Sequence, residues 1–119
     1  MLISNVLAMA LAAQGPAAES QVAYDLLVDG RNEAAIVQIE QNDALEANDP
    51  ARLINLGIAY AREGRTADAR AMFEAAMRSE ERASLETADG EWKDSRHLAR
   101  KAIRMLDQGK LSSTRIAAR

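Results

Sequence analysis

The sequence predicts an all-α fold, a superhelix of stacked helical hairpins that ends in a capping helix. The chain has 119 residues and resembles itself when it is shifted by 34 residues. A period of this length is typical of arrays in which each unit is one helix pair that buries its apolar face against its neighbours. The sequence contains no alternating run rich in β-branched residues, so no sheet is expected. The shift superimposes Pro16 on Pro50, Val22 on Leu56, Ala23 on Gly57, Leu26 on Tyr60 and Gly30 on Gly64.

The first segment, Met1–Ala13, is uncharged and mostly apolar, and it supports two interpretations. Residues 10–12 have the A-x-A form of a signal-peptidase site, which would make the segment a signal peptide and place the mature protein in a bacterial periplasm. The alternative is an extra helix that packs on the first repeat of a cytoplasmic protein. The segment is too short for a transmembrane helix, which needs roughly 20 residues, so no stable membrane span is expected. The amphipathic helix would present Leu2, Val6, Met9 and Ala13 at helical spacing.

The second unit, residues 50–83, carries the clearest pattern. Its first predicted helix has one apolar face with a glycine in the middle: Leu53, Leu56, Gly57 and Tyr60. Glycine costs about 1 kcal/mol of helix propensity relative to alanine, so we expect Gly57 to admit a close neighbouring helix. Gly64 is expected to end the first helix, and Thr66 to cap the second. The second helix carries a facing stripe of small residues around one aromatic: Ala69, Phe73 and Ala76.

This order of residues, with a glycine turn between a Leu–Leu–Gly–Tyr stripe and an Ala–Phe–Ala stripe, resembles the tetratricopeptide repeat. The resemblance implies an α–α superhelix whose concave surface binds a peptide or helix of another protein. The first unit, residues 16–49, keeps the pattern less closely. Glu19 stands where the family has a large apolar residue, and Asn42 where it has a small one. Asn32 takes the place of Thr66 as the expected cap.

The third unit, residues 84–109, keeps only the outline of a helix pair. Its first helix is degenerate, because Thr87 and Gly90 stand at the positions of large residues. The segment Glu91–Asp107 is expected to form one capping helix with an apolar and a basic side. Gly109 is expected to end it, and residues 110–119 to fray. The apolar side has Trp92, Ala99, Ala102, Ile103 and Leu106, and the basic side has Lys93, Arg96, Arg100 and Arg104.

In the family that the chain resembles, the first helix of each pair lines the concave groove. The corresponding residues outside the packing stripes are mainly apolar here, which fits an apolar peptide or an amphipathic helix of a partner protein. The lysine and asparagine clamp by which some members hold a terminal carboxylate is missing. The alternative is a homodimer, or a groove filled by the chain's own N-terminal segment. The predicted groove residues are Tyr24, Leu27, Val28, Ile54, Asn55, Ile58, Arg62 and Trp92.

Composition argues against catalysis and against a cofactor or a metal. The chain has no cysteine and one histidine, which removes thiolate sites and most nucleophilic triads. Asp43, Glu46 and Asp49 follow one another at intervals of three and are expected to form a solvated acidic face. His97 is expected at the surface, and residues 112–114 offer hydroxyl groups without an evident base. The sequence therefore predicts a protein that is not an enzyme, with no catalytic, cofactor-binding or metal site.

Charge is divided along the chain more strongly than its net charge of −3 indicates. Residues 1–92 hold 16 acidic and 7 basic side chains, whereas residues 93–119 hold 2 acidic and 8 basic ones. One interpretation is a basic tail that seeks an anionic surface. The other, which is preferred, is a basic face that is solvated beside an acidic body. Few aromatic residues and an acidic balance argue against a nucleic-acid partner.

Overall fold

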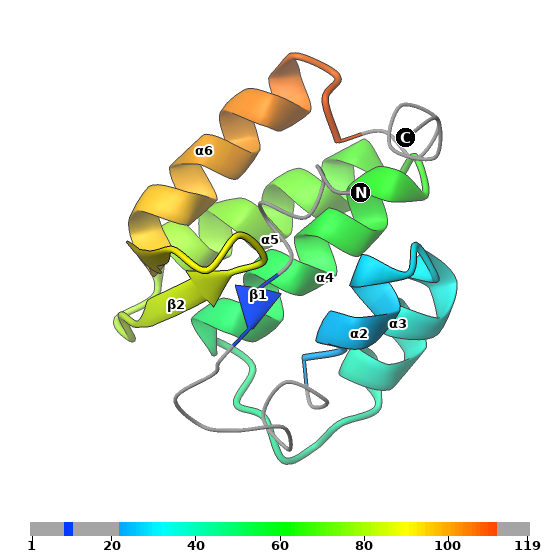
Figure 1. Cartoon of the computed structure of the whole chain (residues 1–119), viewed down its shortest axis with the longest axis horizontal. Coiled ribbons are helices and arrows are strands. Elements are labelled where there is room, and N and C mark those ends of the chain that lie inside the picture. Colours follow the sequence, from blue (N-terminus) through cyan, green and yellow to red (C-terminus); the bar gives the residue numbers. More distant parts are fainter. Residues whose placement is uncertain (1–8, 11–21, 112–119) are drawn as a thin grey trace.

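The computed structural model describes residues 9–10 and 22–111 of the chain. Within these residues the protein is mainly helical, with a small antiparallel sheet whose order is β1–β2–β3 (Figure 1). The predicted helical class is confirmed, and the prediction that the chain has no sheet is wrong. The helices are α2 (Tyr24–Val28), α3 (Asn32–Glu40), α4 (Pro50–Arg62), α5 (Thr66–Arg78) and α6 (Ser95–Asp107). The strands are β1 (Met9–Ala10), β2 (Ser84–Thr87) and β3 (Trp92–Asp94).

Helix α4 is the centre of the fold. It begins after Asp49, whose carboxylate accepts a hydrogen bond of 2.9 Å from the backbone N–H of Arg52. Pro50 occupies the first turn, where its missing N–H needs no partner. The helix packs against α2, α3, α5, α6 and β1, and all of its residues except Arg52 are buried.

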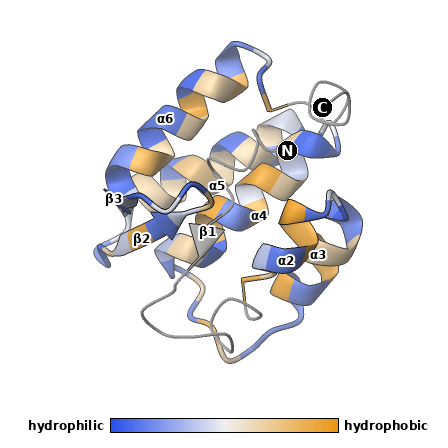
Figure 2. Ribbon diagram, viewed as in Figure 1, coloured by the Kyte–Doolittle hydropathy of each residue, from blue (hydrophilic) through white to orange (hydrophobic). Residues whose placement is uncertain are grey.

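Helix α6 has one buried and one exposed face. In Figure 2 its ribbon accordingly alternates between hydrophilic and hydrophobic colours.

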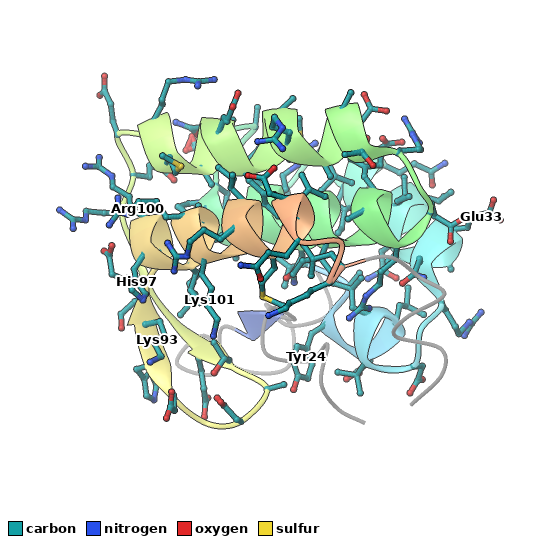
Figure 3. All side chains as sticks on the ribbon, turned by 90° about the horizontal axis from the view of Figure 1, so that it is seen from above. Tyr24, Glu33, Lys93, His97, Arg100 and Lys101 are labelled. Carbon is teal, nitrogen blue, oxygen red and sulfur yellow. The ribbon has the colours of Figure 1, made fainter. Side chains whose placement is uncertain are left out.

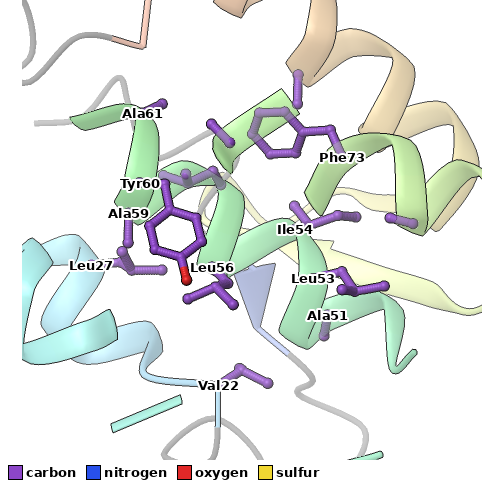
Figure 4. Close-up of a cluster of buried hydrophobic side chains, with 14 of the residues drawn as sticks. Val22, Leu27, Ala51, Leu53, Ile54, Leu56, Ala59, Tyr60, Ala61 and Phe73 are labelled. Carbon is purple, nitrogen blue, oxygen red and sulfur yellow. The ribbon is translucent and has the colours of Figure 1, made fainter. Parts of the chain in front are cut away.

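Helix α5 approaches α4 most closely at Gly57. A β-carbon at this position would lie 2.5 Å from Cε1 of Phe73, and the Phe73 side chain is fully buried. Only a residue without a side chain leaves room for the ring, which confirms the expected role of Gly57. Figure 4 shows Phe73 of α5 and Leu27 of α2 on opposite sides of α4. The central helix therefore joins the first hairpin to the second.

The first helices of both hairpins end in the same turn, 34 residues apart. Gly30 and Gly64 adopt the left-handed conformation, with φ of 77° and 81°. In each turn the N–H group after the glycine donates to the carbonyl five residues earlier, which satisfies a free carbonyl at the helix end. These bonds join Arg31 to Leu26 and Arg65 to Tyr60, each at 2.8 Å. The predicted glycine stop at Gly64 is confirmed, and the two turns keep the 34-residue spacing of the sequence. Gly109, with φ of 71°, follows the end of α6 in the same way.

The predicted N-caps of the two second helices are wrong. Asn32 and Thr66 are the first residues of α3 and α5, and the cap positions are Arg31 and Arg65, whose side chains make no capping hydrogen bond. Asn32 is buried, and its Oδ1 accepts a hydrogen bond from Arg62. The Asn32 side chain therefore forms a hydrogen bond between the two hairpins and does not cap α3.

Between α5 and α6 the chain forms a β-hairpin, where the sequence analysis expected a degenerate helix. The turn contains Asp89 and Gly90, and Gly90 has a φ of 86°. The Asp89 carboxylate accepts hydrogen bonds from the Thr87 hydroxyl and the Glu91 N–H, which stabilises the turn. Asp-Gly is a frequent hairpin turn, but the strands beside it are too short to show an alternating pattern. The register pairs Ser84 with Asp94, Leu85 with Lys93 and Glu86 with Trp92.

Helix α6 begins at Ser95 and not at Glu91, so Trp92 lies on β3 instead of the apolar side of a capping helix. The helix starts there because the Asp94 carboxylate accepts a hydrogen bond of 3.2 Å from the His97 N–H. Two interactions join the hairpin base to the preceding segment: Nε of Arg82 lies 2.9 Å from Oδ1 of Asp94, and the Ser95 N–H donates to the Ala83 carbonyl at 2.8 Å.

Strand β1 pairs antiparallel with β2, which leaves β3 at the edge of the sheet. The alternative of a retained N-terminal helix is therefore wrong at Met9 and Ala10. The rest of Met1–Ala13 lies outside the described residues, as do residues 14–21 and 112–119. The signal peptide and the frayed tail stay predictions.

Gly57→Ala is expected to lower the free energy of unfolding by about 1–3 kcal/mol, although alanine is the better helix former. The added methyl group collides with Phe73, whose ring is buried on all sides. Urea denaturation followed by circular dichroism measures the change. In a Phe73→Leu background the same substitution should cost less, because the colliding ring atoms are absent. An equal cost in both backgrounds would contradict the close contact.

Candidate functional site

Most of the residues predicted to line a groove are inside the molecule. Five of them are 1% exposed or less: Leu27, Ile54, Asn55, Ile58 and Arg62. Tyr24 is half-buried, and only Val28 and Trp92 are exposed, at 42% and 49%. These eight side chains therefore do not form the open apolar groove that the sequence analysis expected.

The reason for this correction is that α4 has neighbours on every side. Besides the helices of its own hairpin and of the first one, it contacts α6 and strand β1. Figure 1 shows β1 lying against α4. A segment from the N-terminal part of this chain therefore lies on the helix that was expected to receive a partner's peptide.

Two polar residues predicted for the groove join the hairpins instead. The Asn55 amide donates a hydrogen bond of 3.0 Å to the Val22 carbonyl. Nη1 of Arg62 donates to the Leu27 carbonyl at 2.7 Å and to Oδ1 of Asn32 at 3.4 Å. Burial lowers the pKa of Arg62 to about 10, so the guanidinium remains protonated at neutral pH. Both side chains thus connect the first hairpin to the centre of the fold.

Tyr60 makes a further polar contact between the hairpins. Its hydroxyl donates to the Glu40 carboxylate, and the guanidinium carbon of Arg65 lies 4.2 Å from the centroid of its ring, a cation–π geometry. Burial, together with the hydrogen bond to Glu40 and its charge, raises the pKa of Tyr60 to about 12. The phenol therefore remains a neutral donor far above neutral pH, which suits a structural contact.

Opposite charges gather at two ends of the molecule. The acidic end, residues 22–46, holds six carboxylates and one arginine, and all six carboxylates are on exposed residues. The basic end, residues 92–111, holds six lysines and arginines and two carboxylates. Figure 1 places α2 and α3 far from α6, and Figure 3 shows Glu33 and Arg100 at opposite extremes of the molecule. The charge division along the sequence thus becomes a division in space.

The basic end has an exposed stripe on α6, formed by His97, Arg100 and Arg104 and called the α6 stripe below. These residues are three and four positions apart, so they share one side of the helix, and all three are exposed. Within the described part of the chain, Arg100 and Arg104 make no ion pair. Both carboxylates of this end have partners on other elements: Arg82 pairs with Asp94 and Arg70 with Asp107.

Trp92 is the large apolar side chain exposed at the same end. It lies on the edge strand β3, directly before α6. Successive strand residues point to opposite faces, and the inner face of β2 carries the buried Leu85 opposite Lys93. Trp92 therefore stands on the outer face of the sheet. Tryptophan and arginine are the residues that protein interfaces use most effectively, so this combination is the strongest candidate for a binding surface.

The acidic end carries a second stripe that the sequence analysis missed. Glu33, Val37 and Glu40 are four and three positions apart on α3 and are all exposed, Val37 at 51%. We call this set the α3 stripe. Its helical spacing is present in the sequence. It presents two carboxylates around one apolar side chain.

The remaining predicted sites form no chemical constellation. In residues 9–10 and 22–111 no three metal-ligating side chains are placed to hold an ion. No helix in this part of the chain is long and apolar enough to cross a membrane. Asp43 and Glu46 lie in the loop before α4, and Asp49 caps that helix, so the three do not share a helix face. His97 is exposed, as expected, and residues 112–114 lie outside the described residues.

Comparison with known proteins finds no family model, no curated protein and no solved structure that matches this chain. The fold alone therefore defines the class: a mainly helical protein with a β-hairpin between the last two helices that the structure describes. The tetratricopeptide resemblance stays a prediction.

Ile58→Glu is now expected to unfold the protein, where a groove position would have kept it folded. The side chain is fully buried, and an unpaired carboxylate there costs about 4 kcal/mol or more, a large part of the total stability of a small domain. Circular dichroism at 222 nm measures the loss. The matched control is Val28→Glu at an exposed position, which should melt like the wild type. A folded Ile58→Glu variant would restore the groove assignment.

Proposed function

We propose that this chain is a non-enzymatic protein–protein interaction module that binds an acidic protein surface at its basic end. The observation that carries the proposal is the exposed Trp92 at the same end as the α6 stripe, whose arginines make no ion pair among the described residues. An indole buries a large area when it is covered, and guanidinium groups bind carboxylates in a bidentate manner. Together they favour a partner that offers carboxylates around an apolar patch.

The helical hairpins would act as the rigid support of this surface, and we propose that they are tetratricopeptide-like. Helix α4 packs between α3 and α5, and α6 packs on α5, as consecutive helices do in such an array. The matching turns after Gly30 and Gly64 support a tandem duplication. In a repeat array the terminal unit carries a polar outer face. Helix α6 is the last helix among the described residues, and its exposed stripe is open to a partner helix.

Binding in the concave groove has less support than binding at the basic end. Ile54 and Ile58 are fully buried, and β1 lies against α4. A peptide that reached these side chains would first have to displace part of the chain. The charged surface of α6 needs no such rearrangement, which moves the proposed binding surface from the groove to the end of the array.

Poly-L-glutamate is expected to bind the wild-type protein at low salt and to change the fluorescence of Trp92, the only tryptophan of the chain. Arg100→Ala/Arg104→Ala should weaken this binding roughly tenfold, since two exposed ion pairs are lost. The control Arg31→Ala/Arg78→Ala removes the same charge from exposed positions outside the basic end and should bind like the wild type. Equal binding by both double variants would contradict the proposal.

A further inference from the structure

We infer that the acidic surface taken by the basic end is the acidic end of a second copy of this chain, so that copies join head to tail. The inference rests on the proposed function, because it names the partner of the same α6 stripe. It requires that the two ends complement one another in charge, shape and apolar contact, and that no symmetric pairing does so as well.

The two stripes match in charge and in length. Glu33 and Glu40 are seven residues apart on α3, and His97 and Arg104 are seven residues apart on α6. Both intervals correspond to about 10.5 Å along a helix axis. When α6 of one copy lies along α3 of the next, the α6 stripe and the α3 stripe run the same distance. The aliphatic stem of Arg100, in the middle of one stripe, can cover an apolar side chain in the middle of the other.

The exposed apolar side chains are divided between the same two ends. In the described part of the chain the large exposed hydrophobic residues are Val28, Val37 and Trp92. The two valines are at the acidic end, and the tryptophan is at the basic end. A head-to-tail contact would bring all three toward one interface, where apolar residues at the centre and charges at the rim are the usual arrangement.

A symmetric dimer does not pair the acidic end with the basic end. In a two-fold contact both copies use the same patch, and one patch cannot hold both stripes because these lie on opposite sides of the molecule (Figure 3). A dimer through the basic ends would therefore oppose two α6 stripes of like charge. A dimer through the acidic ends would oppose two α3 stripes, with the same repulsion. The ends lie on opposite sides of the molecule (Figure 3), so one copy cannot join its own ends. Successive copies would therefore form a ring or an open chain.

Sedimentation velocity of the full chain tests the inference. The wild type should form complexes that grow with concentration and dissociate in high salt, because exposed charges are screened beyond a distance of about 3 Å at 1 M salt. Arg100→Ala/Arg104→Ala removes both arginines of the α6 stripe, and Glu33→Gln/Glu40→Gln removes both carboxylates of the α3 stripe while an amide oxygen remains for Tyr60. Each double variant alone should be a monomer. Mixed together they should form a one-to-one dimer and nothing larger, since each retains one intact end.

Circular dichroism of both double variants shows whether they are folded, and Glu33→Gln/Val37→Ser replaces the second one if Glu40→Gln disturbs the fold. Glu63→Gln/Glu80→Gln, at exposed positions outside both ends, should assemble like the wild type.

Three results would overturn the inference, and they are distinguishable from failure of the proposed function. A wild type that stays monomeric at every concentration, while poly-L-glutamate still binds, leaves the proposed function and removes the second copy as partner. Dimers of either double variant alone would indicate a symmetric contact instead. If neither poly-L-glutamate nor a second copy binds, the proposed function and the inference both fail.

Discussion

The contact between Gly57 and Phe73 is the constraint on which the rest of the structure depends. It lets α5 approach α4 so closely that a single additional carbon would lie 2.5 Å from the ring. With α5 in that place, α6 packs on α5 and also reaches α4. The first hairpin closes the other side through hydrogen bonds from Asn55 and Arg62. The absence of a side chain at Gly57 thus allows α4 to be almost completely buried.

Much of the fold could be predicted from the sequence where local patterns decide the structure. The first-turn position of Pro50 and the turn at Gly64 depend on backbone preferences within a few residues, and they agree with the structure. The two N-cap predictions are wrong because Asn32 and Thr66 lie one residue inside their helices, a shift that periodicity does not detect. The β-hairpin was not predicted because strands of three or four residues leave no alternating pattern, and Gly90 was aligned with a large residue of a degenerate helix.

The candidate site was less accessible to sequence reasoning. Periodicity shows which side chains share a face of a helix, but it does not show what covers that face. Ile54 and Ile58 therefore suggested a groove, although they are buried in a fold where β1 and α6 also contact their helix. The imbalance of charge was visible in the sequence, whereas the location of the charged stripes on the molecule was not. Only the fold shows that the stripes that contain Glu33 and Arg100 lie at opposite ends of the molecule (Figure 3).

The pairing of β1 with β2 has a consequence for the order in which the protein folds. It brings Met9 next to Thr87, a contact between segments that are distant in sequence, whereas each helical hairpin is made of neighbours. Closing a long loop is entropically expensive and slow compared with local helix formation. Strand β1 is therefore expected to join the local β2–β3 hairpin last, after the helices have formed. During synthesis, residues 9–10 would therefore reach their native place only after residues 84–87 have been made.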